Sequence, residues 1–229
     1  TKDFSWNTTF TISHNRQMVE DIGHENYVAT LESWGNSKYM MYGYRKGYPL
    51  NSLWGFEYAG PWQNEEQLKQ YYQESNTYVS STLADKTDDA KVKTLLGLPK
   101  YVDQDKNGVL SEKDLVYLGN SDPVLYGGLN NTFHWKNFKF SFYFIYSLGG
   151  KIYNYSEMFM GGGKITNQYR YMLDAWHPVR NPDSWHPRPN KDYNLMPSSR
   201  QVHDASYLRL KTVSIAYTLP FKNGNIFKD

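Results

Sequence analysis

FKFSFYFIYS, residues 138 to 147, is the stretch that decides the fold. Its side chains alternate strictly, which predicts a β-strand because successive side chains of a strand point to opposite faces. One face is entirely aromatic: Phe138, Phe140, Phe142, Phe144 and Tyr146. The other face is mixed: Lys139, Ser141, Tyr143, Ile145 and Ser147. The pattern suits a strand with its aromatic face toward lipid and its other face toward a wet lumen. A buried strand of a β-sandwich is the alternative, and this stretch alone favours neither.

Other segments repeat the two-residue period. Residues 4 to 12 place Phe4, Trp6, Phe10 and Ile12 on one side, and residues 129 to 135 do the same with Leu129, Phe133 and Trp135. A last strand is predicted from Tyr207 to Thr218. Its apolar phase switches between Leu210 and Val213, which predicts a β-bulge or a change of environment. Shorter strands are predicted at 27–33, 38–45 and 53–58, with a turn at Gly35-Asn36 between the first two.

The connections between the predicted strands are very unequal. Only Lys136-Asn137 separates Trp135 from Phe138, whereas residues 63–122 and 149–204 are long connections. Residues 63–98 are rich in polar side chains, so we predict an exposed loop with little core of its own and a short helix at 65–74. Outer-membrane barrels have short periplasmic turns and long extracellular loops. On the barrel interpretation, both long connections are therefore extracellular.

Composition limits the class of protein. The 229 residues carry a formal charge of +2, which gives no bulk signal for nucleic acid or a polybasic membrane contact. Cysteine is absent, which excludes disulfides and thiol chemistry. Aromatic residues reach 17% of the chain, yet no apolar run approaches the ~18 residues of a spanning helix. This combination fits a sugar-binding sandwich or a transmembrane barrel with aromatic girdles.

DQDKNGVLSEKD, residues 103–114, has nearly the spacing of a calcium loop. Such a loop supplies oxygens at its positions 1, 3, 5, 7, 9 and 12. Those positions are held here by Asp103, Asp105, Asn107, the Val109 carbonyl, Ser111 and Asp114. Gly108 permits the sharp turn, and Leu110 is placed to anchor the loop to a core. We therefore expect Ca²⁺ as a candidate ligand that rigidifies this loop.

Two departures keep a second interpretation of this loop open. Asp114 replaces the usual bidentate Glu and is one methylene shorter, and no amphipathic helix precedes the loop. These departures exclude a paired EF-hand sensor. The alternative is an acidic Asn-Gly turn in which Ser111 starts a short helical turn, with no metal bound.

No motif for catalysis is present. The six histidines form no HExxH, and His177 and His186 lie in repeated Trp-His-Pro triplets that predict packed loop residues more than metal ligands. The sequence lacks a GxSxG elbow, and GGGK at 161–164 is not a P-loop. We expect no enzyme and name no catalytic residue. The substrate-contacting residues are unknown from the sequence.

Three pieces of the chain occur in the order found in one family. They are GYPLNSLWGFEYAGPWQNEEQ, then YVDQDKNGVLSEKDLVYLGNSDPVLYGGLNNTFHWKNFKFSFYFIYSLGGKIYN, and finally ASYLRLKTVSIAYTLP. Together they resemble the C-terminal barrel portion of SusC/RagA-type TonB-dependent outer-membrane transporters of Bacteroidetes. Trp176-His177-Pro178 with Asn181-Pro182 also resembles that family's Trp-x-Pro and Asn-Pro loop. Residues 63–98 match less well.

The resemblance implies an all-β fold, an antiparallel transmembrane barrel of which residues 1–229 are one part, in the cell outer membrane. It implies a plug and a TonB-contacting segment elsewhere in a longer protein, and a SusD-like lipoprotein lid over the mouth. It implies import of an oligosaccharide or a peptide, with no nucleic acid. Phe138, Phe140, Phe142, Phe144 and Tyr146 would then contact the lipid bilayer, whereas Lys139, Ser141 and Tyr143 would face the lumen or the plug.

Two rival functions make different predictions. A soluble, calcium-stabilised carbohydrate-binding β-domain predicts that protein covers the aromatic face from Phe138 to Tyr146. A glycan-degrading enzyme predicts a cleft with two converging carboxylates, and no pair of acidic residues in the sequence stands out for that role. The ordered resemblance favours the transporter over both.

Overall fold

The computed structural model describes residues 3–23, 28–29, 42–68, 95–107, 110–161, 167–190 and 196–220. Two compact units divide the chain. Residues 1–16, 122–150 and 204–229 form the first, called here the strand unit, and residues 17–121 and 151–203 form the second, called the loop unit.

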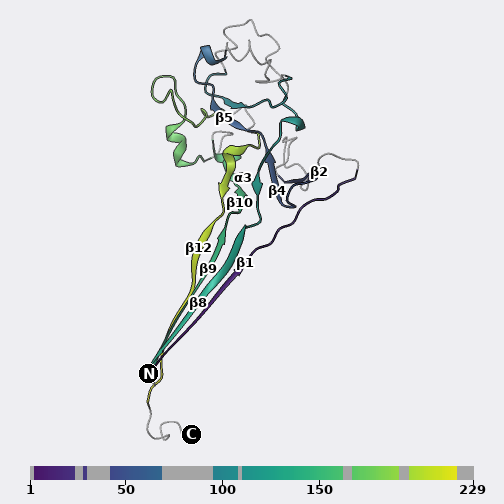
Figure 1. The fold of residues 1–229 in the computed structure, drawn as a ribbon. Coiled ribbons are helices and arrows are strands. Elements are labelled where there is room, and N and C mark those ends of the chain that lie inside the picture. Colours follow the sequence, from purple (N-terminus) through teal and green to yellow (C-terminus); the bar gives the residue numbers. More distant parts are fainter. Residues whose placement is uncertain are drawn as a thin grey trace, which may run out of the picture. The chain divides into compact units, whose positions relative to one another are not determined.

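The strand unit is a four-stranded antiparallel sheet in the order β1-β8-β9-β12 (Figure 1). Its strands are β1 (Phe4–Ser13), β8 (Leu125–Trp135), β9 (Phe138–Leu148) and β12 (Tyr207–Tyr217). All are long, and β1, β8 and β9 keep a period of two without interruption. Trp135 lies directly opposite Phe138, which confirms the tight connection at Lys136-Asn137. Lys136 has φ 51°, and its N–H donates to the carbonyl of Asp3 at 2.7 Å.

The predicted change of phase in the last strand is a bulge. Leu210 pairs with Phe144 and Thr212 pairs with Tyr143, so Lys211 is the extra residue. An extra residue on one strand reverses the faces of the residues that follow it. Leu208, Leu210, Val213 and Ile215 consequently share one face of the sheet although their sequence spacing changes.

The loop unit consists of short elements. Its two-stranded sheets pair β2 (Val28–Ala29) with β3 (Gly43–Tyr44), β4 (Ser52–Gly55) with β7 (Val116–Asn120), β5 (Tyr58–Pro61) with β6 (Pro99–Tyr101), and β10 (Lys151–Tyr153) with β11 (Val202–Asp204). Short helical segments are η1 (Glu112–Asp114), α3 (Tyr155–Met160), η2 (Arg170–Asp174) and η3 (Ser199–Gln201). Among the described residues, no helix is long and apolar enough to cross a membrane.

The buried residues of the loop unit come from segments distant in sequence. One cluster joins Phe56 and Tyr58 to Tyr101, Leu110 and Leu115, with Met196 packed against it. A second joins Leu53 to Tyr153. Leu110 is 7% exposed, so the prediction that it anchors the acidic loop to a core is confirmed.

Several predicted elements differ in the structure. The strand predicted at 53–58 is two strands, because β4 ends at Gly55 and β5 begins at Tyr58. Of the strands predicted at 27–33 and 38–45, the described residues include only β2 and β3, and the predicted turn at Gly35-Asn36 lies outside the described residues.

The segment at 63–98 is also less exposed at its ends than its composition predicts. Leu68, Leu95 and Leu98 are all buried, since the backbone pairs Trp62 with Leu98 and Gly97 and brings these side chains inward. Residues 65–68 are helical, and the remainder of the helix predicted at 65–74 is only partly within the described residues.

Candidate functional site

The register of the strand unit sorts its side chains onto two faces. Phe4, Trp135, Phe138 and Tyr217 lie in one row across the four strands, and Trp6, Phe133, Phe140 and Ile215 form the next such row. Side chains directly opposite on neighbouring strands share a face. The predicted aromatic residues of β9 are therefore one column of a face that is apolar on all four strands.

Aromatic contacts organise this apolar face. Along β9, the ring of Phe142 lies 5.8 Å from that of Phe140 and 5.6 Å from that of Phe144. Across strands, Phe133 stacks on Phe140 at 6.2 Å. Phe138 is 47% exposed and Phe140 is 38% exposed, so protein of the described residues leaves this end of the face open. Within the described residues, the covering that a soluble carbohydrate-binding domain predicts for this face is therefore not seen at Phe138 and Phe140.

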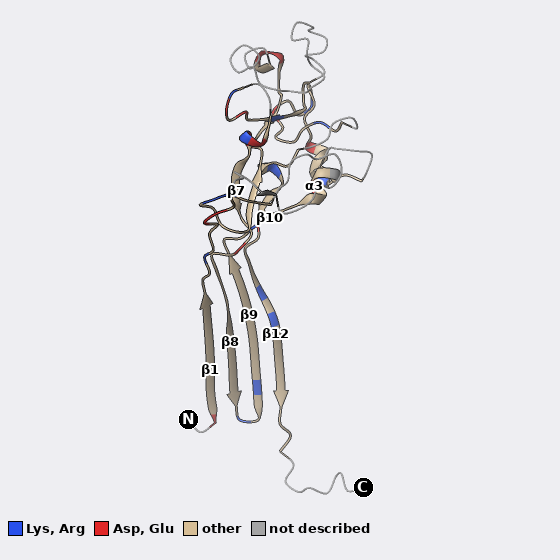
Figure 2. Ribbon diagram, turned by 90° about the vertical axis from the view of Figure 1, so that its right-hand side faces the viewer, with Lys and Arg blue, Asp and Glu red and all other residues tan. Residues whose placement is uncertain are grey.

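The opposite face is polar. It carries Ser5, Asn7, Thr9 and Thr11 from β1, and Lys139, Ser141 and Tyr143 from β9. No Asp or Glu occurs in β1, β8, β9 or β12, all of which are fully described, and the basic residues within them are Lys139, Arg209 and Lys211 (Figure 2). The sheet thus has one apolar face and one polar face.

The predicted calcium loop brings three carboxylates together. Asp103, Asp105 and Asp114 each offer an oxygen, and these oxygens lie within 4.8 Å of one another. Ca²⁺ binds oxygens at about 2.3–2.6 Å, so two of its ligands can be up to about 5.2 Å apart. The three carboxylates therefore fit a single calcium-sized ion. Asp103 and Asp114 are buried, with 6% and 0% exposure, whereas Asp105 is exposed.

The same loop is also held by its own hydrogen bonds. The carboxylate of Asp114 accepts from the backbone N–H groups of Gln104 at 2.9 Å and Ser111 at 2.7 Å. Ser111 caps η1 and forms a capping box with Asp114, so the predicted start of a helical turn at Ser111 is confirmed. The Asn107 side chain donates to Asp105 at 2.8 Å. Gly108 and Val109 lie outside the described residues.

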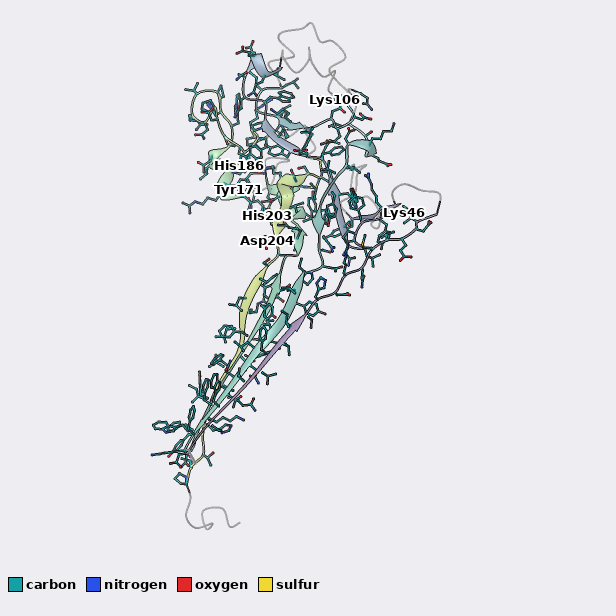
Figure 3. All side chains as sticks on the ribbon, viewed as in Figure 1. Lys46, Lys106, Tyr171, His186, His203 and Asp204 are labelled. Carbon is teal, nitrogen blue, oxygen red and sulfur yellow. The ribbon has the colours of Figure 1, made fainter. Side chains whose placement is uncertain are left out.

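The two Trp-His-Pro triplets pack in the loop unit. Trp176 is buried, and its backbone N–H donates to the carbonyl of His186 at 2.8 Å. His177 closes a turn with Asn181 through two backbone hydrogen bonds. His186 stacks on Tyr171 with ring centroids 4.5 Å apart, and both residues are marked in Figure 3. Burial, followed by the charge of Arg200, lowers the pKa of His186.

Comparison with known proteins places these features in a family. No family model matches the chain. TonB-dependent receptor P26 of Formosa agariphila is 30% identical over 228 residues, which is 96% of this chain and 21% of the relative. TonB-dependent receptor P3 of the same organism is 30% identical over 221 residues, again covering 96% of this chain and 20% of the relative.

A solved structure described as the RagAB peptide transporter shares the fold. It has a TM-score of 0.64 and 21% identity, with 96% of this chain and 21% of that chain covered. The chain belongs to the TonB-dependent receptors, and its fold is that of the RagAB structure, in keeping with the resemblance to SusC/RagA-type transporters. It spans about a fifth of the length of the relatives it matches. Its apolar sheet face and antiparallel topology are those of part of a TonB-dependent barrel fold.

One cluster of aromatic side chains at the surface was not predicted from the sequence. Tyr48 and Tyr117 meet on top of the buried Trp54, although Tyr117 lies far from the other two in sequence. Neither tyrosine belongs to a regular apolar period, because Tyr48 lies in a turn and β7 is short. The only signal was the general excess of aromatic residues, which does not say which rings meet.

Proposed function

We propose that this chain forms part of the barrel wall and of the extracellular loops of a TonB-dependent importer in the cell outer membrane. The cargo would be a nutrient, either an oligosaccharide or a peptide. The observation that carries the proposal is the two-faced sheet of the strand unit. An apolar, aromatic face backed by a polar face is what a barrel wall between lipid and a wet lumen requires.

The edges of the sheet support the same proposal. Within the described residues, β1 pairs only with β8, and β12 pairs only with β9. Backbone groups at membrane depth must be hydrogen-bonded because lipid offers them no partner. In a closed barrel, further strands would satisfy both edges. The four strands are therefore best explained as one arc of a larger ring.

The connections suggest an orientation. The tight turn at Lys136-Asn137 would lie on the periplasmic side, and residues 63–122 and 149–204 would lie outside the cell. The relatives are named receptors and the solved neighbour is named a peptide transporter, so no observation points to an enzyme. A lipoprotein lid of the SusD type and TonB itself are the proposed partners, because the resemblance to SusC/RagA-type transporters implies both and the relatives are named TonB-dependent receptors.

We also propose that the acidic loop at 103–114 binds Ca²⁺. Asp103, Asp105 and Asp114 would supply carboxylate oxygens, and Asn107, Ser111 and the Val109 carbonyl are the further predicted ligands. The support is the compact set of three carboxylates, two of them buried. A divalent cation would offset the repulsion among these like charges. Its role would be to hold a loop in shape rather than to take part in chemistry.

The barrel proposal is tested by the environment of alternating positions on β9. Single cysteines at Phe140, Ser141, Phe142 and Tyr143 of the full-length protein would carry a nitroxide, since this segment has no native cysteine. In liposomes, labels at Phe140 and Phe142 should collide with oxygen dissolved in lipid. Labels at Ser141 and Tyr143 should not. Equal, low oxygen collision at all four positions would contradict a lipid-facing column.

The import proposal needs a transport measurement. Cells with the full-length gene should accumulate a labelled oligosaccharide or peptide only when TonB and the proton-motive force are intact. Cells that lack the gene provide the baseline. Accumulation that continues without TonB would contradict the proposal.

A further inference from the structure

The loop unit presents a rigid aromatic surface that the barrel wall does not explain. Trp54 is 1% exposed, and its indole N–H donates to the carbonyl of Gly43 at 3.1 Å. Tyr48 meets this ring edge-on at 4.7 Å, and Tyr117 meets it at 5.7 Å. The two tyrosine rings are 5.3 Å apart and tilted by 47°. The buried indole thus supports two rings that meet at an angle.

Backbone contacts fix both tyrosines. The carbonyl of Tyr48 accepts from the N–H of Val19 at 2.9 Å, and the carbonyl of Val19 accepts from the N–H of Gly47 at 2.8 Å. Gly47 has φ 83°, which allows the turn that brings Tyr48 back over Trp54. Tyr117 lies in β7 directly opposite Trp54 in β4. These rings would therefore lose little conformational freedom when a ligand binds to them.

The two rings remain accessible despite this packing. Tyr48 is 38% exposed and Tyr117 is 40% exposed. Burial of part of the ring, followed by the neighbouring Tyr48, raises the pKa of Tyr117. Its hydroxyl therefore stays protonated near neutral pH and can both donate and accept a hydrogen bond. Apolar ring surface beside a hydroxyl suits a ligand that has C–H groups and hydroxyls on the same small ring.

A basic residue stacks on the indole that supports the two tyrosine rings. The guanidinium of Arg45 lies 4.2 Å from the centre of the Trp54 ring, and its Nη2 donates to the carbonyl of Glu112 at 3.2 Å. Arg45 is thus committed to the protein. Lys46, in the same turn, is exposed and is labelled in Figure 3.

We propose that Tyr48 and Tyr117, supported by Trp54, form a platform that binds a sugar ring of a saccharide. The C–H groups of a pyranose would pack on the two ring faces, and its hydroxyls would bond to the tyrosine hydroxyls. This inference rests on the proposed import function and narrows its cargo to saccharides. It assigns the platform to cargo capture and leaves passage through the barrel to other parts of the protein.

The test uses the full-length protein, purified in detergent, on an array of neutral and acidic oligosaccharides with a matched panel of peptides. Wild-type protein should bind members of the oligosaccharide array. The double variant Tyr48→Ala with Tyr117→Ala should bind them about tenfold more weakly or worse, since two ring contacts are lost. Tyr48→Phe with Tyr117→Phe keeps the rings and should retain more of the affinity than the alanine variant.

Tyr155→Ala is the matched control, because Tyr155 is 42% exposed and packs edge-on against Tyr153 at 4.5 Å in the same unit. It should bind like wild type. Binding only to peptides, no binding to any oligosaccharide, or equal binding by the double alanine variant would each overturn the proposal. Cellular uptake separates the platform proposal from the import proposal. If the platform binds saccharides but cells show no TonB-dependent uptake, only the import proposal is contradicted.

Discussion

The indole N–H of Trp6 donates to Oδ1 of Asn131 at 2.8 Å, linking residues 125 positions apart in sequence. Trp6 and Asn131 both lie on the apolar face of the strand unit, where β1 pairs with β8. Asn131 is 5% exposed, although its face is otherwise nearly free of polar side chains. The pair therefore places two polar groups on an apolar surface without leaving the indole N–H unsatisfied.

We predict that replacing one member of this pair lowers the free energy of unfolding by more than would be expected from the loss seen when both members are replaced. Trp6→Phe would leave the buried amide of Asn131 without its indole donor, and we expect the free energy of unfolding to fall by about 1–3 kcal/mol. Asn131→Leu should have a similar cost through the unpaired indole. The double variant should recover part of the loss, because neither polar group is then left without its partner.

The measurement is urea-induced unfolding of the full-length protein in detergent, analysed as a double-mutant cycle. Asn130→Ala, at the neighbouring position on the polar face, is the control and should change stability little. Additive losses in the double variant would show that the two side chains are not coupled, contrary to the expectation.

Gly127 and Gly128 should differ in their tolerance of a side chain. A Cβ at Gly127 would lie 2.0 Å from the carbonyl oxygen of Thr11, which is backbone of the neighbouring strand. A Cβ at Gly128 would mainly meet the ring of Tyr143 at 2.8 Å, which can move. We expect Gly128→Ala to cost about 1–3 kcal/mol and Gly127→Ala to cost more.

Second-site variants separate the two causes. Tyr143→Ser should relieve Gly128→Ala because it removes the obstructing ring. Tyr146→Phe should not relieve Gly127→Ala, since the Thr11 carbonyl remains in place although the Tyr146 hydroxyl, 2.9 Å from that Cβ, is gone. Unfolding in urea gives the free energies of unfolding of the two glycine variants and of the two variants that carry a second change. Equal costs for the two glycines would show that the strands separate easily at this point.

The strand unit was predictable because a single local rule governs it. Strict alternation in FKFSFYFIYS assigned each side chain from Phe138 to Ser147 to its observed face, and the phase switch after Leu210 located the bulge. The pairing of β1 with β8 was not predicted, because the sequence does not say which strands are neighbours. Contacts such as that of Trp6 with Asn131 depend on this pairing and could not be predicted for the same reason.

The loop unit was less predictable because its cores are made by contacts between distant segments. Leu110 was expected to be buried because a calcium-like loop has an apolar residue at that position. Phe56, Tyr101 and Met196 meet in the same cluster with no shared period between them. The platform of Tyr48 and Tyr117 arises in the same way. The sequence shows that both tyrosines are present but does not show that their rings are in contact.

Calcium should stabilise the full-length protein if the acidic loop binds it. For an extracellular loop the dissociation constant is expected on the order of 10⁻⁴–10⁻³ M. At ten times that concentration the stabilisation would be about 1.4 kcal/mol, visible as a rise in Tm that EDTA reverses. Asp103→Asn with Asp105→Asn should abolish the rise, because both changes remove carboxylates from the cluster.

Glu112→Gln is the matched control, since Glu112 lies in the same loop but outside the three-carboxylate cluster. It should keep the calcium response. Asp114 is a poor test position because its carboxylate also accepts hydrogen bonds from Gln104 and Ser111, so its loss weakens the loop without any metal. A Tm that rises with calcium equally in the double variant would exclude this loop as the site.

Acid should loosen the loop around His186. Burial and the charge of Arg200 lower the pKa of His186, while Asp174 and Glu157 act more weakly in the opposite direction. A histidine with a lowered pKa in the folded state binds fewer protons there than in the unfolded state. Its contribution to stability is therefore complete above the unfolded pKa of about 6.5 and declines as the pH falls through the folded value.

Hydrogen exchange of residues 167–190 in the full-length protein, measured from pH 7.5 to pH 5 and corrected for intrinsic rates, checks this expectation. Protection should decrease below about pH 6.5 in the wild type, as protonation of His186 disfavours its packing on Tyr171. His186→Gln should flatten the profile because the titrating ring is gone. His134→Gln changes a histidine of β8 in the strand unit, outside the measured segment, and should leave the profile intact. If His186→Gln preserves the acid-induced loss of protection, a different group must be responsible for it.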